Sequence, residues 1–172
     1  KTLSSEYVFK GKVIDVKRDD ILVSNGHKSI REVVEHSGGV VILAIKDNKI
    51  LTVKQYRYPI SNTSIELPAG KLEKGENPDF AAKRELEEET GFVAKNWTSL
   101  GYIYTSPGFC DEKLHLYLAQ DLTFKKENPD EDEILENDRY TIQELLEMID
   151  NGTINDSKTL CAILRARKYL YD

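Results

Sequence analysis

The first third of the chain alternates short runs of β-branched and aromatic residues with polar breaks, a pattern that predicts β-strands. The continuously apolar run at 40–45 is typical of a strand buried on both faces. Asn25-Gly26 predicts a hairpin because both residues tolerate positive φ, and Pro59 ends a strand because it cannot donate to a ladder. The expected strands are residues 7–16, 21–23, 29–35, 40–45 and 50–58.

The pattern becomes helical over residues 78–90. Asn77 is a natural N-cap, Pro78 suits the first helical position and Gly91 follows the last one. Two further strands are expected at 97–105 and 114–119, the second with alternating leucines, and a short one near Ile134.

Two more helices close the chain. Thr141 and Glu144 form a capping box that opens a helix ending at 151–152. Asp156 can cap a final helix, whose expected buried stripe is Leu160, Ile163 and Leu164. Helices beside a mixed sheet indicate an α/β or α+β sandwich. We expect an N-terminal antiparallel β extension at 1–38 and the main domain at 39–172.

Composition describes an ordinary soluble protein of 172 residues, 40% hydrophobic, with a net charge of −6. This charge argues against a general nucleic-acid binder, and the longest apolar run is far shorter than a membrane span. No secretory signal opens the sequence, so we expect a cytoplasmic location. Cys110 and Cys161 lack metal-type spacing and are expected to be reduced.

Four acids lie within five positions of the helix at 78–90, namely Glu85, Glu87, Glu88 and Glu89. Most charge runs are solvated faces, and the geometry of the helix tests that interpretation. Glu85 and Glu89 fall on the same arc as Ala81, Ala82 and Leu86, with Glu88 at their flank, whereas Lys83, Glu87 and Thr90 take the opposite side. Phe80 does not fit the inner arc.

If the alanine side packs inward, two carboxylates are carried inward with it. Crowded, desolvated carboxylates are costly unless a cation neutralises them. Carboxylates without a nearby His or Cys suit Mg²⁺ or Mn²⁺ better than Zn²⁺. Arg84 can pair with Glu88 and fix its rotamer. The alternatives at this point are a metal site and a solvated or structurally paired face.

The spacing of the segment 70–92 resembles the signature of the Nudix hydrolases. The match covers nine positions over 23 residues: Gly70, Glu76, Arg84, Glu85, Leu86, Glu88, Glu89, Gly91 and Phe92. The resemblance implies a Nudix fold, a mixed sheet between helices, and hydrolysis of a nucleoside diphosphate linked to another moiety. It also implies two or three Mg²⁺ ions, with Mn²⁺ as the alternative, on Glu85 and Glu89, assisted by Glu88, with the Ala69 carbonyl and Glu76 as further candidates.

The rest of the chain resembles the ADP-ribose pyrophosphatase branch of that family. Three segments carry the likeness: Arg31–His36 followed by two glycines, residues 55–59 with 66–70, and Ser106-Pro107-Gly108, whose proline lies sixteen positions after Gly91. The resemblance implies substrate contacts from Arg31, Arg57, Ser106, Pro107, Gly108 and Glu112. Arginine suits a diphosphate because its planar fork makes bidentate, charge-assisted contacts.

An acidic segment at 127–138 holds seven acids and no base. The simplest interpretation of this segment is a solubilising loop without a catalytic role. The resemblance implies instead a lid that carries the catalytic base, Glu133, with Glu131 as the alternative. The expected reaction converts ADP-ribose and water into AMP and ribose 5-phosphate.

Rival hypotheses are a Nudix enzyme for another ADP-sugar, a dinucleoside polyphosphate or NADH, and a non-catalytic ADP-ribose sensor. The sensor is disfavoured because such proteins typically lose the motif glutamates, which are all present. The resemblance further implies a homodimer formed through the N-terminal strands. Tyr7, Phe9 or Tyr56 could stack on adenine, although a core role fits each of them better.

Overall fold

The computed structural model describes residues 1–126 and 136–170, and the chain divides into two units. The first unit combines Lys1–Gly38 with Tyr104–Lys113, and the second combines Gly39–Ile103 with Leu114–Asp172. Among the helices of the described ranges, none is long and apolar enough to cross a membrane.

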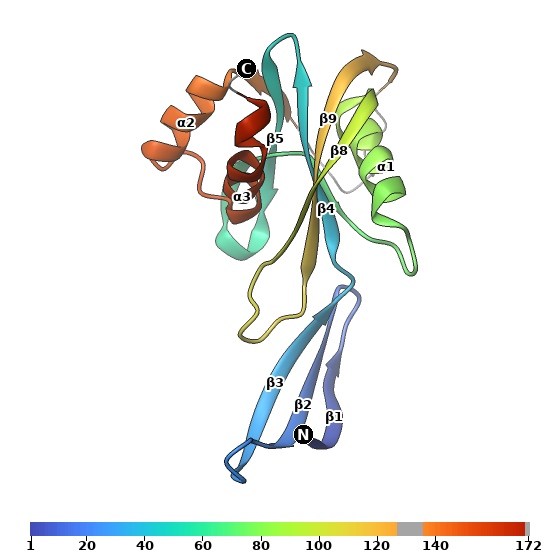
Figure 1. The fold of residues 1–172 in the computed structure, drawn as a ribbon, viewed down its shortest axis with the longest axis vertical. Coiled ribbons are helices and arrows are strands. Elements are labelled where there is room, and N and C mark those ends of the chain that lie inside the picture. Colours follow the sequence, from blue (N-terminus) through green and yellow to red (C-terminus); the bar gives the residue numbers. More distant parts are fainter. Residues whose placement is uncertain (127–135, 171–172) are drawn as a thin grey trace. The chain divides into compact units, whose positions relative to one another are not determined.

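The first unit is built on an antiparallel sheet in the order β1-β2-β3, comprising β1 (Thr2–Lys10), β2 (Ile14–Leu22) and β3 (Lys28–His36) (Figure 1). Gly26 adopts a φ of 82° in the predicted hairpin. The single strand predicted at 7–16 is wrong. Its two ends belong to neighbouring strands, on which Phe9 pairs with Val16 across a turn where the Gly11 amide donates to the Ile14 carbonyl at 3.0 Å. Apolar residues on both sides of this turn conceal it in the sequence.

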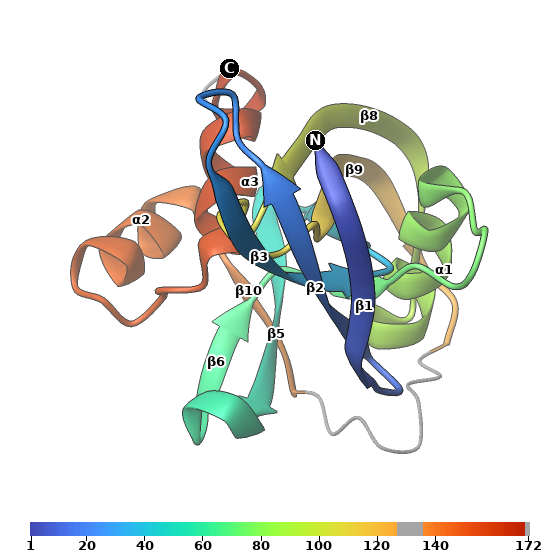
Figure 2. The ribbon, with the colours of Figure 1, turned by 90° about the horizontal axis from the view of Figure 1, so that it is seen from below.

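The second unit contains a mixed sheet with helices on both faces (Figures 1 and 2). Its strands follow the order β10-β5-β4-β9-β8, in which β4 and β9 are parallel, while β6 pairs with β5 and β7 with β4. The strands are β4 (Gly39–Lys46), β5 (Lys49–Arg57), β6 (Asn62–Glu66), β7 (Ala69–Lys71), β8 (Phe92–Tyr104), β9 (Lys113–Phe124) and β10 (Glu136–Tyr140). The helices are α1 (Pro78–Thr90), α2 (Ile142–Asp150) and α3 (Ser157–Ala166), and the short helices are η1 (Tyr58–Ile60) and η2 (Arg167–Tyr169).

Strand β4 separates two hydrophobic cores. Val41 and Leu43 join one cluster with Leu145 and Ile163 of α2 and α3, whereas Ile42 and its alternating neighbours join a second cluster with residues of α1. Successive side chains of a strand point to opposite faces, so one strand buried on both faces serves both cores. The prediction of a sandwich with a mixed sheet is confirmed.

One expectation about the elements needs correction, one cannot be checked, and two strands were not expected. Leu164 is exposed, and the buried face of α3 is formed by Thr159, Ala162, Ile163 and Ala166. Strands β6 and β7 are too short and irregular in their pattern to be predicted from periodicity. The strand expected near Ile134 falls outside the described residues, and β10 begins just after that gap.

Candidate active site

Helix α1 forms where the local signals place it. The Asn77 side chain accepts a hydrogen bond from the Asp79 amide at 2.8 Å, Pro78 occupies the first turn, and Gly91 ends the helix at a φ of 71°. The buried residues of the helix are Ala81, Ala82, Glu85, Leu86, Glu89 and Thr90. The inward position of Glu85 and Glu89 therefore agrees with the helical arc of the sequence.

Two other residues of α1, Thr90 and Phe80, lie outside the inner arc of the helix and differ from each other in burial. The prediction that Thr90 faces solvent is wrong, because its hydroxyl donates to the Leu86 carbonyl one turn earlier, which allows a polar side chain to be buried. Phe80 is exposed, with the Lys83 ammonium 5.9 Å from its ring centroid, which explains why it does not fit the inner arc.

The buried carboxylates of α1 face β7. The Ala69 amide donates to Glu89 Oε2 at 3.0 Å. A Cβ placed on Gly70 would lie 1.8 Å from the Glu85 carboxyl carbon, so the Glu85 carboxylate occupies the space that a side chain would take. Glycine at position 70 is thus needed for the carboxylate to approach the backbone so closely.

Arg84 forms ion pairs with three acids of the motif. Its guanidinium contacts Glu85 Oε1 and Glu88 Oε2, both at 2.8 Å, and makes two hydrogen bonds of 3.0 Å to Glu76. The predicted pair between Arg84 and Glu88 is confirmed. Hydrogen bonds from Arg84 lower the pKa of Glu76 below its ordinary value, and the same bonds raise the pKa of Arg84.

The donor atoms available here suit a hard divalent cation. Glu85 and Glu89 present carboxylates beside the backbone at 69–70, and the absence of a side chain on Gly70 leaves a cradle that the Glu85 carboxylate occupies. Within the described residues, no group of three or more His, Cys, Asp or Glu lies close enough to form a complete metal site. Glu89 lies against Ala69 and Glu85 against Gly70, while Glu85 and Glu88 are both paired with Arg84. The donor chemistry fits Mg²⁺ or Mn²⁺.

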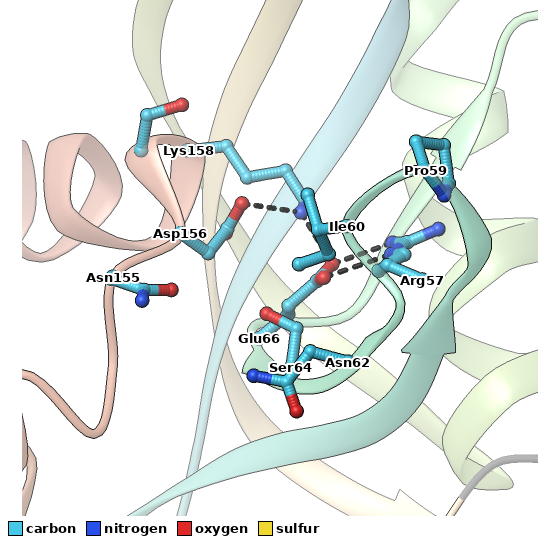
Figure 3. Close-up of a pocket in the computed structure, with 10 residues that line it drawn as sticks. Arg57, Pro59, Ile60, Asn62, Ser64, Glu66, Asn155, Asp156 and Lys158 are labelled. Atoms are coloured by element: carbon cyan, nitrogen blue, oxygen red, sulfur yellow. Dashed lines mark hydrogen bonds and ion pairs between the residues drawn. The ribbon is translucent and has the colours of Figure 1, made fainter.

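A second polar centre surrounds Glu66 at the end of β6. The sequence predicted Arg57 of this centre as a substrate contact but did not indicate its partners Glu66 and Lys158. Arg57 donates to both Glu66 carboxylate oxygens, from Nε at 2.8 Å and from Nη2 at 2.5 Å, and Lys158 of α3 contacts the same carboxylate (Figure 3). An open cavity of about 560 Å³ lies over this centre, and its lining residues are Arg57, Pro59, Ile60, Asn62, Ser64, Glu66 and Asn155–Lys158. A lone acid between apolar residues at 65–68 was the available signal.

Electrostatics at this centre follow from burial and pairing. Burial alone would raise the pKa of Glu66, but the hydrogen bonds and charges of Arg57 and Lys158 outweigh it and lower the pKa to about 2. Hydrogen bonding to Glu66 raises the pKa of Arg57, and the Glu89 charge contributes in the same direction. The negative charges of Glu89, in the candidate metal site, and of Glu66 therefore both stabilise the charged form of Arg57.

The other predicted substrate residues belong to the first unit. Arg31 on β3 donates to the Ser29 hydroxyl and the Ile30 carbonyl. Ser106, Pro107 and Gly108 form a turn closed by the Cys110 amide donating to the Ser106 carbonyl at 2.9 Å. Glu112 accepts a hydrogen bond from the Thr105 hydroxyl at 2.7 Å. Glu133 and its alternative Glu131 lie outside the described residues.

Comparison with known proteins agrees with this architecture. A family model described as the NUDIX domain matches residues 35–163, and one described as the nucleoside diphosphate sugar hydrolase N-terminal domain matches residues 1–34. The fold matches a crystal structure of an ADP compounds hydrolase with a TM-score of 0.88 and 26% identity, covering 99% of this chain and 93% of that one.

Similar proteins of known name span nearly the whole chain. An ADP-ribose pyrophosphatase of Bacillus subtilis is 47% identical, covering 95% of this chain and 90% of its own length. A methanol dehydrogenase activator of Bacillus methanolicus is 47% identical with the same coverages. An ADP-ribose pyrophosphatase of Mycobacterium tuberculosis is 38% identical, covering 95% of this chain and 81% of its own length. With its motif helix, its sheet between helices and these matches, the chain belongs to the Nudix hydrolase family.

Proposed function

We propose that this protein hydrolyses the diphosphate of ADP-ribose to AMP and ribose 5-phosphate, using Mg²⁺ as its cofactor. The observation that carries the proposal is the placement of Glu85 and Glu89, two inward-facing carboxylates of one helix, against the backbone at 69–70. The ADP-ribose pyrophosphatases among the relatives, at 47% and 38% identity, support the choice of substrate.

Glu85 and Glu89 would hold the metal, with Glu88 and the Ala69 carbonyl as further ligands. A bound divalent cation neutralises diphosphate oxygens and lowers the pKa of a coordinated water. Arg57, whose guanidinium is partly exposed above Glu66, binds a diphosphate oxygen. Arg31, Ser106, Pro107, Gly108 and Glu112 are proposed to bind the remainder of the substrate.

The chemical step needs a base for the attacking water. We assign this role to Glu133, with Glu131 as the alternative, on the strength of the family resemblance. The carboxylate takes a proton as the water oxygen bonds to one phosphorus, and the bond from that phosphorus to the bridging oxygen breaks. AMP and ribose 5-phosphate are then the two products.

A substrate panel tests the proposal. Purified protein is incubated with ADP-ribose, other ADP-sugars, dinucleoside polyphosphates and NADH, each with Mg²⁺, with Mn²⁺ and with EDTA, and the products are identified by chromatography. ADP-ribose is expected to give the highest kcat/KM, and EDTA is expected to abolish turnover. Hydrolysis in ¹⁸O-labelled water shows which product gains the label and hence which phosphorus is attacked.

The panel also separates the rival functions. The match to an ADP compounds hydrolase supports another ADP-linked substrate as the second candidate. Preference for such a compound would overturn the ADP-ribose assignment while keeping the metal site. Binding of ADP-ribose without any product release would indicate a non-catalytic sensor.

A further inference from the structure

The Arg57 guanidinium is oriented by a partner that lies beneath it. Two of its three nitrogens, Nε and Nη2, donate to Glu66, while Nη1 makes no hydrogen bond to any residue within 1–126 or 136–170. The Glu66 side chain is 3% exposed and the Arg57 side chain 38% exposed. The guanidinium is therefore held by a buried carboxylate, while its Nη1 is left for another acceptor.

Lys158 is the second cation on the same carboxylate. Its side chain is 14% exposed, and its ammonium contacts both Glu66 and Asp156 Oδ1, the latter at 2.9 Å. The other oxygen of Asp156 caps α3 by accepting from the Thr159 amide at 3.0 Å. Lys158 is thus fixed by the first turn of α3, whereas Arg57 extends from the end of β5 (Figure 3).

The same helix terminus also holds the strand end next to Glu66. The Thr159 hydroxyl accepts a hydrogen bond from the Leu67 amide at 3.0 Å. Residues 66 and 67 are therefore anchored to α3 through side chains 92 positions away in the sequence. Three residues after Glu66, the Ala69 amide meets Glu89 of the candidate metal site.

One cation would be insufficient to neutralise Glu66 while Arg57 also binds a substrate anion. An arginine that contacts a diphosphate shares its positive charge between the substrate and Glu66. A buried carboxylate left with part of one countercharge is costly, and it would compete with the substrate for the guanidinium. The ammonium of Lys158 keeps Glu66 neutralised while Arg57 turns its available edge to an anion.

We propose that Lys158 is a positioning residue that, through Glu66, holds the Arg57 guanidinium in the orientation that binds the substrate diphosphate. The inference rests on the proposed function, because it takes a nucleoside diphosphate as the anion that Arg57 meets. Lys158 acts through Glu66 and makes no contact with the substrate.

A binding cycle tests the inference without relying on turnover. The probe is the non-hydrolysable α,β-methylene analogue of ADP-ribose, titrated in the presence of Mg²⁺ by calorimetry. Lys158→Met is expected to weaken binding about tenfold, because a guanidinium that is poorly oriented loses bidentate geometry. Lys158→Arg, which restores the positive charge, is expected to bind within about twofold of wild type.

The decisive comparison is made in a second background. In Arg57→Met protein, the further change Lys158→Met is expected to alter affinity by less than about twofold, because the residue through which it acts is gone. An undiminished tenfold loss in that background would overturn the inference, as would wild-type affinity in the single variant. Lys95→Met, on an exposed residue of β8, is the matched control and is expected to bind like wild type.

Folding and function are separated by two further measurements. Thermal unfolding shows whether each variant is folded, and Lys158→Gln replaces Lys158→Met if the latter is not. Wild-type protein that neither binds the analogue nor hydrolyses ADP-ribose would overturn the proposed function, and the inference with it. Hydrolysis of ADP-ribose by wild type, combined with unchanged analogue affinity in Lys158→Met, would overturn the inference alone.

Discussion

Glu87 and Glu89 are two positions apart on α1 and have the same side chain, yet their surroundings differ completely. Glu89 is 4% exposed and accepts from the Ala69 amide, whereas the Glu87 side chain is 42% exposed and its carboxylate lies 3.2 Å from the Lys125 ammonium. A surface ion pair of this kind contributes little to stability. A buried carboxylate facing backbone and a neighbouring acid is suited to bind a cation.

The two residues therefore provide a matched pair of substitutions. Glu89→Gln is expected to lower Mg²⁺-dependent kcat by about a hundredfold or more, because it removes a charged ligand while preserving shape. Glu87→Gln is expected to leave kcat within about twofold. Steady-state rates with ADP-ribose measure both variants, and full turnover by Glu89→Gln would show that the metal assignment is wrong.

Gly70 offers a test of the cradle itself. Gly70→Ala would place a methyl group 1.8 Å from the Glu85 carboxyl carbon, so the carboxylate must move. Activity is expected to fall by about tenfold or more, since misplaced catalytic groups are costly.

The matched control for Gly70→Ala is Gly152→Ala. Gly152 has a φ of 77° and nothing within 4 Å of a built Cβ, so the change strains only the backbone. It is expected to reduce the free energy of unfolding by about 1 kcal/mol without changing kcat. Urea denaturation and kinetics on both variants measure the two effects, and equal losses of activity in the two would contradict the role of the cradle.

At the scale of elements, three segments meet on one carboxylate. Arg57 ends β5, Glu66 ends β6 and Lys158 lies in the first turn of α3, so this cluster joins a hairpin to a helix. Removing the charge of one member of a buried cluster is destabilising, because its partners are then left buried without compensation. The cluster should therefore make the stability of the second unit dependent on pH.

Acid is expected to weaken this junction. The pKa of Glu66 falls from 4.5 to about 2 on folding, so its contribution is fully present above pH 4.5 and is lost as pH falls towards 2. A shift of this size corresponds to at most about 3 kcal/mol. Urea denaturation at a series of pH values measures the loss, and Glu66→Gln should remove this part of the pH dependence. An unchanged dependence in the variant would show that other carboxylates cause it.

At the scale of the whole molecule, the first unit leaves apolar side chains on its surface. Tyr7, Val8 and Phe9 of β1 are exposed, so the core role expected for Tyr7 and Phe9 is wrong, and β1 is an edge strand of its three-stranded sheet. An exposed edge with apolar side chains is suited to pair with another chain. These features support the homodimer implied by the family resemblance, in which the N-terminal strands of two copies associate.

Light scattering coupled to size exclusion tests this proposal. Wild-type protein at micromolar concentration is expected to show twice the 19.7 kDa mass of one chain. Val8→Glu is expected to produce monomers, because a charge in an apolar interface is costly. Leu164→Glu, on an exposed residue of α3, is the control and should remain dimeric. A monomeric wild-type protein would remove the proposal.

The charge of the molecule is distributed unevenly, which its net value of −6 conceals. Residues 70–92 hold seven acids and four bases, and residues 127–138 hold seven acids and no base, so the remaining residues carry a net charge of +4. A net positive charge over the remaining residues is compatible with an anionic substrate. Under the proposed function, the acids would act on that substrate through a bound cation.

The sequence alone determined what depends on neighbours within a turn or two. Asn77, Pro78 and Gly91 bound α1 because capping is local, and the spacing of Glu85 and Glu89 places both on the helix face shared with Ala81. The apolar run of β4 predicted burial on both faces for the same reason, since strand periodicity is a local property.

Only the tertiary structure decided which partner each polar group takes. Glu66 meets Lys158 from 92 positions away, and the Leu67 amide donates to the Thr159 hydroxyl across the same separation. Such outcomes depend on how strands and helices assemble, because packing brings distant residues together and removes the water that would otherwise satisfy them. The local sequence pattern does not indicate which distant residues come into contact. The cluster of Arg57 with Glu66 and Lys158 therefore became visible only in the folded chain.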